Sequence, residues 1–315
     1  MMPTDATDPR LPPGLTVFER GWLSANNVLA VGPEGATLVD SGYATHRDQT
    51  LALVAAALGG RPLDRLFNTH LHSDHCGGNA ALQARYPGLH TAIPPGEADA
   101  VRAWDDARLS YRPTGQTCPR FAIDAVLAPG TEVPLAGLPW QVLAAPGHDP
   151  HAVLLFQPDW RVLISGDALW ENGFGVVFPE LEGQRAFDEV GDTLALIAGL
   201  RPRTVIPGHG AVFGGDETAV NAALDRARSR LAQFRQAPAQ HTAYAAKVLL
   251  KFKLMEWRDV AEPALRDWAV RTPYLQGLHA QAGDPADLST WVDGLLGALV
   301  RSGAAERRDG RVFDR

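Results

Sequence analysis

The stretch Thr69-His70-Leu71-His72-Ser73-Asp74-His75 holds three of the chain's ten histidines within six residues. It directly follows Leu63–Asn68, an apolar segment that is typical of a short buried strand. Imidazole nitrogens and carboxylate oxygens are the ligands that suit zinc and similar divalent metals. Burying these groups without a metal would leave costly unpaired polar atoms. The stretch therefore predicts a metal site at the end of a strand.

The spacing of the histidines and the aspartate in this stretch indicates how their side chains are divided between metal positions. In an extended segment alternate side chains point the same way, so we expect His70, His72 and Asp74 to face one side. The glycine turn Cys76-Gly77-Gly78 can swing His75 toward a second position. One short segment can thus serve two adjacent metal ions.

Three more candidate ligands occur later, each after an apolar run and inside a glycine-containing turn. They are His148 in Ala145-Pro146-Gly147-His148, Asp167 in Ile164-Ser165-Gly166-Asp167 and His209 in Ile206-Pro207-Gly208-His209. Turns of this kind are where a rigid scaffold positions site residues. Together with the first stretch they provide enough ligands for two metal ions.

The ordered set resembles the metallo-β-lactamase superfamily, and within it the glyoxalase II-like hydrolases. The resemblance begins at Asp40 in Leu38-Val39-Asp40-Ser41-Gly42 and continues through the His70–His75 stretch, His148, Asp167 and His209. It implies a four-layer αββα sandwich of the α+β class, with the metals at one edge. That agrees with the coarse pattern of strand-rich segments flanked by helices.

Carried over residue by residue, the resemblance implies a role for each side chain. His70, His72 and His148 would bind the first metal; Asp74, His75 and His209 would surround the second; Asp167 would bridge the two. Asp40 would support the loop beneath the metals rather than bind one. Two divalent ions are expected, zinc in the first place, with iron or manganese as alternatives.

This metal set implies hydrolysis. Two divalent ions about 3.5–4 Å apart can hold a bridging water and lower its pKa to near neutrality, so a metal-bridging hydroxide is the expected nucleophile. Asp74 is the expected catalytic residue, orienting the nucleophile and transferring protons. We expect a small ester, a thioester such as an acyl-coenzyme A, or a lactone as substrate. The alternative is an iron dioxygenase on the same fold, with a single iron on His70, His72 or His148, and Asp167.

Candidate substrate contacts come from two aromatic stretches and one extra histidine. The insertion Trp104–Phe121 contributes Tyr111, and the segment after Asp167 contributes Trp170 and Phe174. His151 follows His148 at a position where relatives commonly have glycine. Ordinary packing is the alternative for each of these side chains.

The character of the chain changes after about residue 240. The segment 241–315 predicts helices over Ala243–Phe252, Asp259–Val270 and Leu288–Arg301, then a hairpin around Asp309-Gly310. This order resembles a winged-helix module. We predict a catalytic domain over 1–240 and a winged-helix-like domain over 241–315 that packs against the first or forms an oligomer contact. The 11 basic and 10 acidic side chains of this segment nearly cancel, which disfavours the alternative of nucleic-acid processing or regulation.

Composition and charge narrow the classes of protein to which the chain can belong. The 315 residues carry 36 acidic and 29 basic side chains and a net charge of −7, which disfavours coating of nucleic acid or anionic membranes. No apolar run is long enough to span a membrane, and residues 1–14 lack the basic start and apolar core of a signal peptide. Two cysteines are far too few for a disulfide-stapled scaffold. We expect a cytoplasmic enzyme that acts on a small-molecule substrate. The sequence leaves open whether the chain forms a homo-oligomer.

Overall fold

The computed structural model describes residues 8–315 and divides into two compact units. The first unit contains the chain up to Leu109 together with Thr117–Leu231; the second contains Ser110–Gln116 and Ala232–Arg315. The domain boundary predicted at residue 240 lies a little beyond this division and stays a prediction. Residues 1–7, part of the segment in which we expect no signal peptide, lie outside the described residues.

The strands of the first unit form two six-stranded sheets. The first sheet has the order β1-β2-β3-β4-β5-β6 and the second the order β12-β11-β10-β9-β8-β7. The strands are β1 (Leu15–Phe18), β2 (Asn27–Gly32), β3 (Gly35–Val39), β4 (Arg65–Phe67), β5 (His90–Ile93), β6 (Ala125–Val126), β7 (Glu132–Leu135), β8 (Leu138–Ala144), β9 (Val153–Gln157), β10 (Val162–Gly166), β11 (Thr204–Pro207) and β12 (Phe213–Gly214). Strands β3 to β6 run parallel, as do β10 and β11. The carboxyl ends of these parallel strands therefore share an edge within each sheet.

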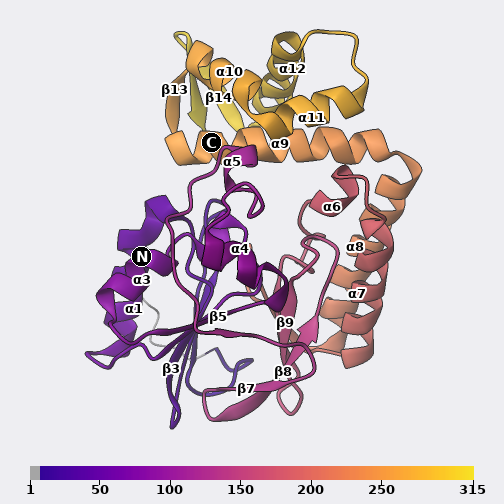
Figure 1. Ribbon diagram of the computed structural model, residues 1–315. Helices are drawn as coiled ribbons and strands as arrows, with labels where there is room; N and C mark the ends of the chain where they lie inside the picture. The colour runs from indigo at the N-terminus through magenta and orange to yellow at the C-terminus, as the bar shows by residue number, and fades with distance from the viewer. Residues whose placement is uncertain (1–7) are drawn as a thin grey trace. The chain divides into compact units, whose positions relative to one another are not determined.

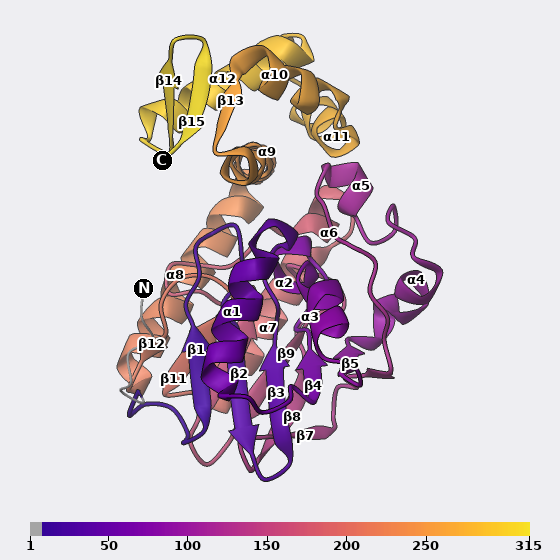
Figure 2. The ribbon, with the colours of Figure 1, turned by 90° about the vertical axis from the view of Figure 1, so that its left-hand side faces the viewer.

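Helices cover the outer faces of both sheets. Figure 1 shows α1 and α3 beside the first sheet and α7 and α8 beside the second, and Figure 2 shows strands β2 to β5 side by side behind α1 and α3. The helices of this unit are α1 (Arg47–Leu58), α2 (Ser73–Cys76), α3 (Asn79–Arg85), α4 (Ala98–Ala103), α6 (Phe178–Leu181), α7 (Ala186–Leu200) and most of α8 (Glu217–Gln236), with short 3₁₀ turns η1 (Ala44–His46) and η2 (Pro95–Glu97). The predicted αββα sandwich is confirmed.

Alternating burial explains the layering of the first sheet. Successive side chains of a strand point to opposite faces. Val28, Val39 and Phe67 join a buried cluster that includes Val153 and Ile164 of the second sheet. Their neighbours join a second cluster with α1 and α3, whose members include Leu29, Leu38, Leu66, Val54, Leu58 and Leu82. Both faces of the sheet are thus apolar, which is why its strands appear in the sequence as continuous apolar runs.

The second unit is mainly helical with a small sheet. It contains α5 (Tyr111–Thr114), α9 (Pro238–Trp257), β13 (Asp259–Ala261), α10 (Glu262–Arg271), α11 (Pro273–Ala282), α12 (Leu288–Arg301), β14 (Ala305–Arg308) and β15 (Arg311–Asp314). The three strands form one sheet in the order β13-β15-β14. Helix α12 and the closing hairpin follow the prediction, whereas α11 was not predicted. No helix among residues 8–315 is both long and apolar enough to cross a membrane.

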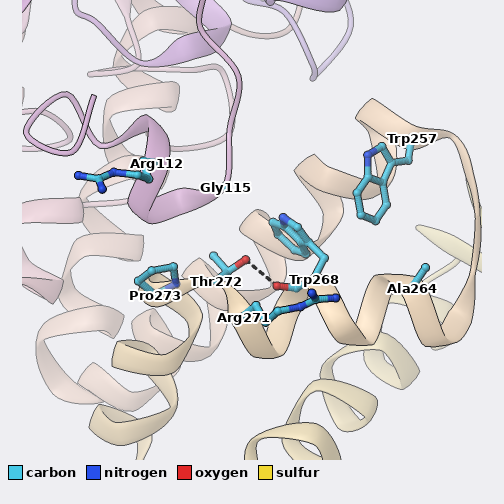
Figure 3. Close-up of a pocket in the computed structure, with 8 residues that line it drawn as sticks. All are labelled: Arg112, Gly115, Trp257, Ala264, Trp268, Arg271, Thr272 and Pro273. Carbon is cyan, nitrogen blue, oxygen red and sulfur yellow. Dashed lines mark hydrogen bonds between the residues drawn. The ribbon is translucent and has the colours of Figure 1, made fainter. Parts of the chain in front are cut away.

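A pocket of about 330 Å³ opens within the second unit (Figure 3). The indoles of Trp257 and Trp268 meet edge to face beside it, with ring centroids 6.1 Å apart. The buried ammonium group of Lys253 lies 5.5 Å and 5.2 Å from the centres of these two rings. Backbone at Gly115 closes against Trp268, because a Cβ at this glycine would lie 2.8 Å from the indole Nε1. The two indoles and the lysine thus form one packed unit beside the pocket.

Candidate metal centre

The predicted ligand stretch begins directly after β4, in the parallel part of the first sheet. His70 and His72 lie on the extended loop that leaves the strand, and His72 is the last extended residue, with φ −63° and ψ 147°. Helix α2 begins at Ser73 and contains Asp74 and His75. The extended conformation that we expected to continue through Asp74 is therefore wrong beyond His72. The helical turn rotates Asp74 and His75 away from the preceding two side chains.

The three later candidates follow strands of the second sheet. His148 comes after β8, Asp167 directly after β10 and His209 two residues after the end of β11. Strand β9 is antiparallel to both β8 and β10, and β10 is parallel to β11. The carboxyl ends of β8, β10 and β11 therefore lie at the same edge of this sheet. This topology brings together side chains that are distant in the sequence.

All seven predicted ligands meet in this part of the first unit. Their potential ligand atoms form three groups, each within 4.8 Å: His70, His72 and His148; His70, His75 and Asp167; and Asp74, His75 and His209. The Asp167 carboxylate is central, with its oxygens 3.4 Å from Nε2 of His75, 3.5 Å from Nε2 of His148 and 3.8 Å from Nε2 of His209. Asp74 lies with His75 and His209 and belongs to none of the groups that contain His70.

The donor set fits divalent metal ions. Among residues 8–315, Nε2 of His70, Nε2 of His75 and Nδ1 of His209 are buried and make no hydrogen bond. A buried polar atom without a partner is costly, and a metal ion would satisfy Nε2 of His70 and of His75. His209 instead directs its Nε2 toward Asp74 and Asp167. Nδ1 of His72 and Nε2 of His148 lie only 2.8 Å apart, so two imidazole nitrogens converge on one point. These features match a site built from histidine and carboxylate ligands.

Glycines make room for the ligands at two positions. A Cβ at Gly208 would lie 2.2 Å from Oδ1 of Asp167, and a Cβ at Gly175 would lie 2.3 Å from Nδ1 of His148. Real Cβ atoms do not approach other atoms so closely, hence only glycine fits at these two positions. The backbone itself therefore forms part of the wall around the ligand side chains.

The surroundings of several of these groups shift their pKa values in the direction that favours binding of a cation. Burial lowers the pKa of His70 well below its usual range, and burial together with the neighbouring His72 lowers the pKa of His148 to about 4. Both imidazoles are therefore neutral at physiological pH, as a metal ligand must be. Burial opposes ionisation of Asp167, but His209 and His75 outweigh it and hold the pKa of Asp167 well below its usual range.

Asp40 supports the ligands from beneath. It directly follows strand β3 and has φ 57°, a left-handed backbone angle that Asp tolerates better than most residues. Its buried carboxylate accepts hydrogen bonds from the backbone and hydroxyl of Thr69, both at 2.9 Å, and from Nδ1 of His75 at 2.8 Å. Burial opposes the charge on His75, but Asp167 and Asp40 raise its pKa well above the usual range. Asp40 thus orients the imidazole of His75 toward Asp167.

The four predicted substrate contacts lie in different surroundings. Trp170 is close to the ligands, since its indole Nε1 donates a 3.1 Å hydrogen bond to Oδ1 of Asp167. Phe174 is 1% exposed and so packs inside the unit. His151 is exposed and its ring lies against Gly96. Tyr111 is buried and belongs to the second unit. Trp170 is therefore in direct contact with a predicted ligand.

Trp22 is a candidate site residue that the sequence did not indicate. It lies in the turn between β1 and β2 and is 56% exposed. Its ring stacks on His209 at 5.4 Å with an interplanar angle of 11° and meets Trp170 edge to face at 5.2 Å. We call Trp22 and Trp170 the tryptophan wall. A single tryptophan in a polar turn carries no motif, so only the folded chain places it here.

This geometry agrees with the comparison to known families. The chain belongs to the metallo-β-lactamase superfamily, whose family model matches residues 20–209. Within the superfamily it falls in the glyoxalase II-like branch, as similarity to hydroxyacylglutathione hydrolases shows. Identity is 31% over 194 residues to the protein of Acidiphilium cryptum, 30% over 168 residues to that of Brucella anthropi and 38% over 163 residues to that of Anaeromyxobacter dehalogenans.

These matches cover only part of each protein. They span 61%, 53% and 50% of this chain and 67%, 53% and 52% of the three relatives, in the same order. Solved structures extend the likeness in fold to nearly the whole chain. A β-lactamase domain protein from Burkholderia ambifaria matches with a TM-score of 0.58 and 20% identity, over 97% of this chain and 93% of its own. A metallo-β-lactamase family protein from Thermus thermophilus matches with a TM-score of 0.54 and 21% identity, over 96% of this chain and 99% of its own.

Proposed function

We propose that the chain is a dinuclear metal-dependent hydrolase of a small ester, thioester or lactone. The observation that carries this proposal is the position of Asp167, whose carboxylate lies within 3.8 Å of imidazole nitrogens from His75, His148 and His209. A carboxylate between two histidine groups is suited to bridge two cations. The relatives named hydroxyacylglutathione hydrolase support a hydrolase acting on a thioester.

The three groups of side chains support an assignment of ligands to two metal ions. One ion would be held by His70, His72 and His148, the other by Asp74, His75 and His209, and Asp167 would be shared. Divalent ions, zinc in the first place, supply Lewis acidity and lower the pKa of water, which is the chemistry that ester and thioester hydrolysis needs.

Asp74 is the proposed proton acceptor of this site. Its carboxylate lies 3.1 Å from Nε2 of His209, and its side chain remains 14% exposed. Burial opposes ionisation, but the hydrogen bond from His209 outweighs it and lowers the pKa of Asp74. The group is therefore ionised at neutral pH and can accept a proton from an attacking water. Trp170 assists by holding Asp167 in one orientation through its indole N–H.

The tryptophan wall favours an apolar group on the substrate. Trp22 is exposed beside His209, and Phe178 packs edge to face against His72 at 5.0 Å. Indole and phenyl faces bind acyl chains and aromatic groups through apolar burial. The chain has only three lysines, Lys247, Lys251 and Lys253, and none belongs to the first unit. We therefore propose a substrate whose reacting end is an apolar acyl group.

The test is a panel of thioesters, lactones, aryl esters, β-lactams and bis-aryl phosphates, run after reconstitution with zinc, manganese or iron. We expect turnover of an ester, thioester or lactone that requires two metal ions per chain. His72→Ala should abolish it, because this histidine is one of three proposed ligands of a single ion. His90→Ala is the matched control, since His90 is an exposed histidine on β5 and should leave activity unchanged.

Other results would contradict the proposal. Turnover that survives in His72→Ala would show that the activity does not come from this site. One iron per chain together with oxygen uptake would identify the alternative, an iron dioxygenase. Turnover of only the bis-aryl phosphates would replace the acyl substrate with a phosphodiester.

A further inference from the structure

The two cysteines of the chain meet in the first unit. Cys76 ends α2, immediately after His75, and Cys118 lies 42 positions later, within the insertion Trp104–Phe121 and after helix α5. Their Sγ atoms are 3.8 Å apart, which is van der Waals contact, and both thiols are reduced. In a disulfide the two sulfurs are about 2.05 Å apart, so bond formation needs an approach of less than about 2 Å.

We propose that Cys76 and Cys118 form a site of reversible oxidative modification, at which a hydroperoxide converts the two thiols into an intramolecular disulfide. Nothing in the proposed hydrolysis uses either sulfur. The inference rests on the contact between the two sulfurs, on their unequal exposure and on the different backbone structure of the two segments that carry them.

Exposure decides which sulfur reacts first. Cys76 is fully buried, and its Sγ lies 3.4 Å and 3.3 Å from the carbonyl oxygens of Leu71 and His72. Cys118 is partly exposed. A hydroperoxide therefore oxidises Cys118 to a sulfenic acid and is itself reduced to water or the corresponding alcohol. The sulfur of Cys76 then attacks the sulfur of Cys118, the S–S bond forms, the S–O bond breaks, and water leaves with the proton of the thiol.

The two segments also differ in backbone structure. The backbone after Cys76 is tightly packed, because a Cβ at Gly77 would lie 2.5 Å from the Ser73 carbonyl oxygen and 2.6 Å from the Ala44 nitrogen. Residues 116–123 around Cys118 form neither helix nor strand. Their contacts include a hydrogen bond from the Thr117 amide to the Tyr43 hydroxyl at 3.0 Å. We therefore expect Cys118 to move toward Cys76, so the disulfide would join this segment to the helix that contains Asp74 and His75.

The test uses the full chain, reduced and then treated with hydrogen peroxide, with remaining thiols trapped by iodoacetamide. Both thiols should disappear together, and the intact mass should fall by two hydrogens. A peptide map without reductant should link the peptide of Cys76 to that of Cys118, and dithiothreitol should restore both thiols. No substrate is involved, so this outcome is independent of the proposed hydrolase.

Cys118→Ser is the main control variant, since Cys118 is on the partly exposed segment and its change should not disturb the core. We expect its remaining thiol, on buried Cys76, to resist peroxide. Cys76→Ser should stop at a sulfenic acid on Cys118, detectable with a dimedone reagent. Two unreacted thiols in the unaltered chain, a disulfide between two chains, or oxygen added to sulfur without a crosslink would each overturn the proposal.

Discussion

The carboxylate of Asp40 accepts a hydrogen bond of 2.8 Å from Nδ1 of His75, on the side of the imidazole opposite to Asp167. This contact leaves Nε2 as the nitrogen that faces the other ligands. Because the second partner of a ligating histidine sets its tautomer and its orientation, Asp40 would control how His75 binds a metal in the proposed site.

Replacing this support should weaken metal binding without removing a ligand. We expect Asp40→Asn to reduce zinc affinity by about 10–100-fold, because the anionic acceptor of the His75 proton is lost. Asparagine tolerates the left-handed backbone at this position, so the change tests the carboxylate rather than the turn. A competition titration with a chromogenic chelator measures the effect. Asp48→Asn, on the exposed start of α1, is the control, and equal affinities in the two variants would refute this role.

The substitution Asp74→Asn should impair proton transfer and leave the fold unchanged. The amide keeps the shape of the side chain but is a very poor proton acceptor, so we expect kcat to fall by about 10²–10⁴-fold. Far-ultraviolet circular dichroism should be unchanged. The measurement is the steady-state rate on the substrate found in the panel, at saturating metal. A variant that retains most of the normal kcat would rule out Asp74 as the proton acceptor.

Gly208→Ala should disrupt the site by steric crowding alone. The new methyl group would lie 2.2 Å from Oδ1 of Asp167 and 2.9 Å from Cε1 of His75, so these two buried side chains would have to shift. We expect a loss of about 1–3 kcal/mol in the free energy of unfolding, as for other overpacking changes, together with weaker metal binding. Gly199→Ala is the matched control, since a Cβ there meets nothing within 4 Å and alanine favours helix α7. Urea denaturation measures the free energy of unfolding of both variants. Equal stability of the two variants would contradict the expected crowding at Gly208.

Trp22→Ala should change substrate binding and leave folding unchanged. The side chain is 56% exposed, so we expect stability to shift by less than about 0.5 kcal/mol. Removing one aromatic face from the tryptophan wall should raise KM for apolar acyl substrates by about 3–10-fold, which corresponds to roughly 0.7–1.4 kcal/mol. Trp160→Ala, at a surface tryptophan that is 39% exposed, is the control. An unchanged KM across acyl chains of different length would exclude Trp22 from the substrate site.

Because His241 is buried, we expect the stability of the second unit to depend on pH. This histidine is buried against Phe234, and burial lowers its pKa to about 4 from the usual 6.5. Between these values the unfolded chain binds a proton that the folded chain excludes, so stability is full above pH 6.5 and falls as the pH drops toward 4. The contribution is up to about 3 kcal/mol. His241→Gln should flatten this part of the urea-denaturation profile, whereas His90→Gln should not. Profiles of equal slope for the unaltered chain and His241→Gln would be evidence against this effect.

Local sequence signals predicted many elements but not all of them. The helix predicted over Ala186–Gly199 closely matches α7, and the strand predicted over Val162–Ser165 lies within β10. Strand β7 was not predicted, because Glu132–Leu135 contains a proline and alternates only weakly. Helix α11 was not predicted either, since it starts only two residues after α10 ends, at Pro273. Short elements of this kind depend on tertiary packing more than on their own residues.

The sequence alone determined which side chains are available as metal ligands and that each follows a strand, because residue type, glycine turns and apolar runs are local properties of the chain. Only the tertiary structure decided which of them meet. Asp74 and His209 are 135 positions apart, and they are brought to 3.1 Å by the order and direction of the strands in two sheets. The same convergence stacks Trp22 on His209 and places Cys118 against Cys76. These contacts arise between segments remote in sequence, and no local pattern encodes them.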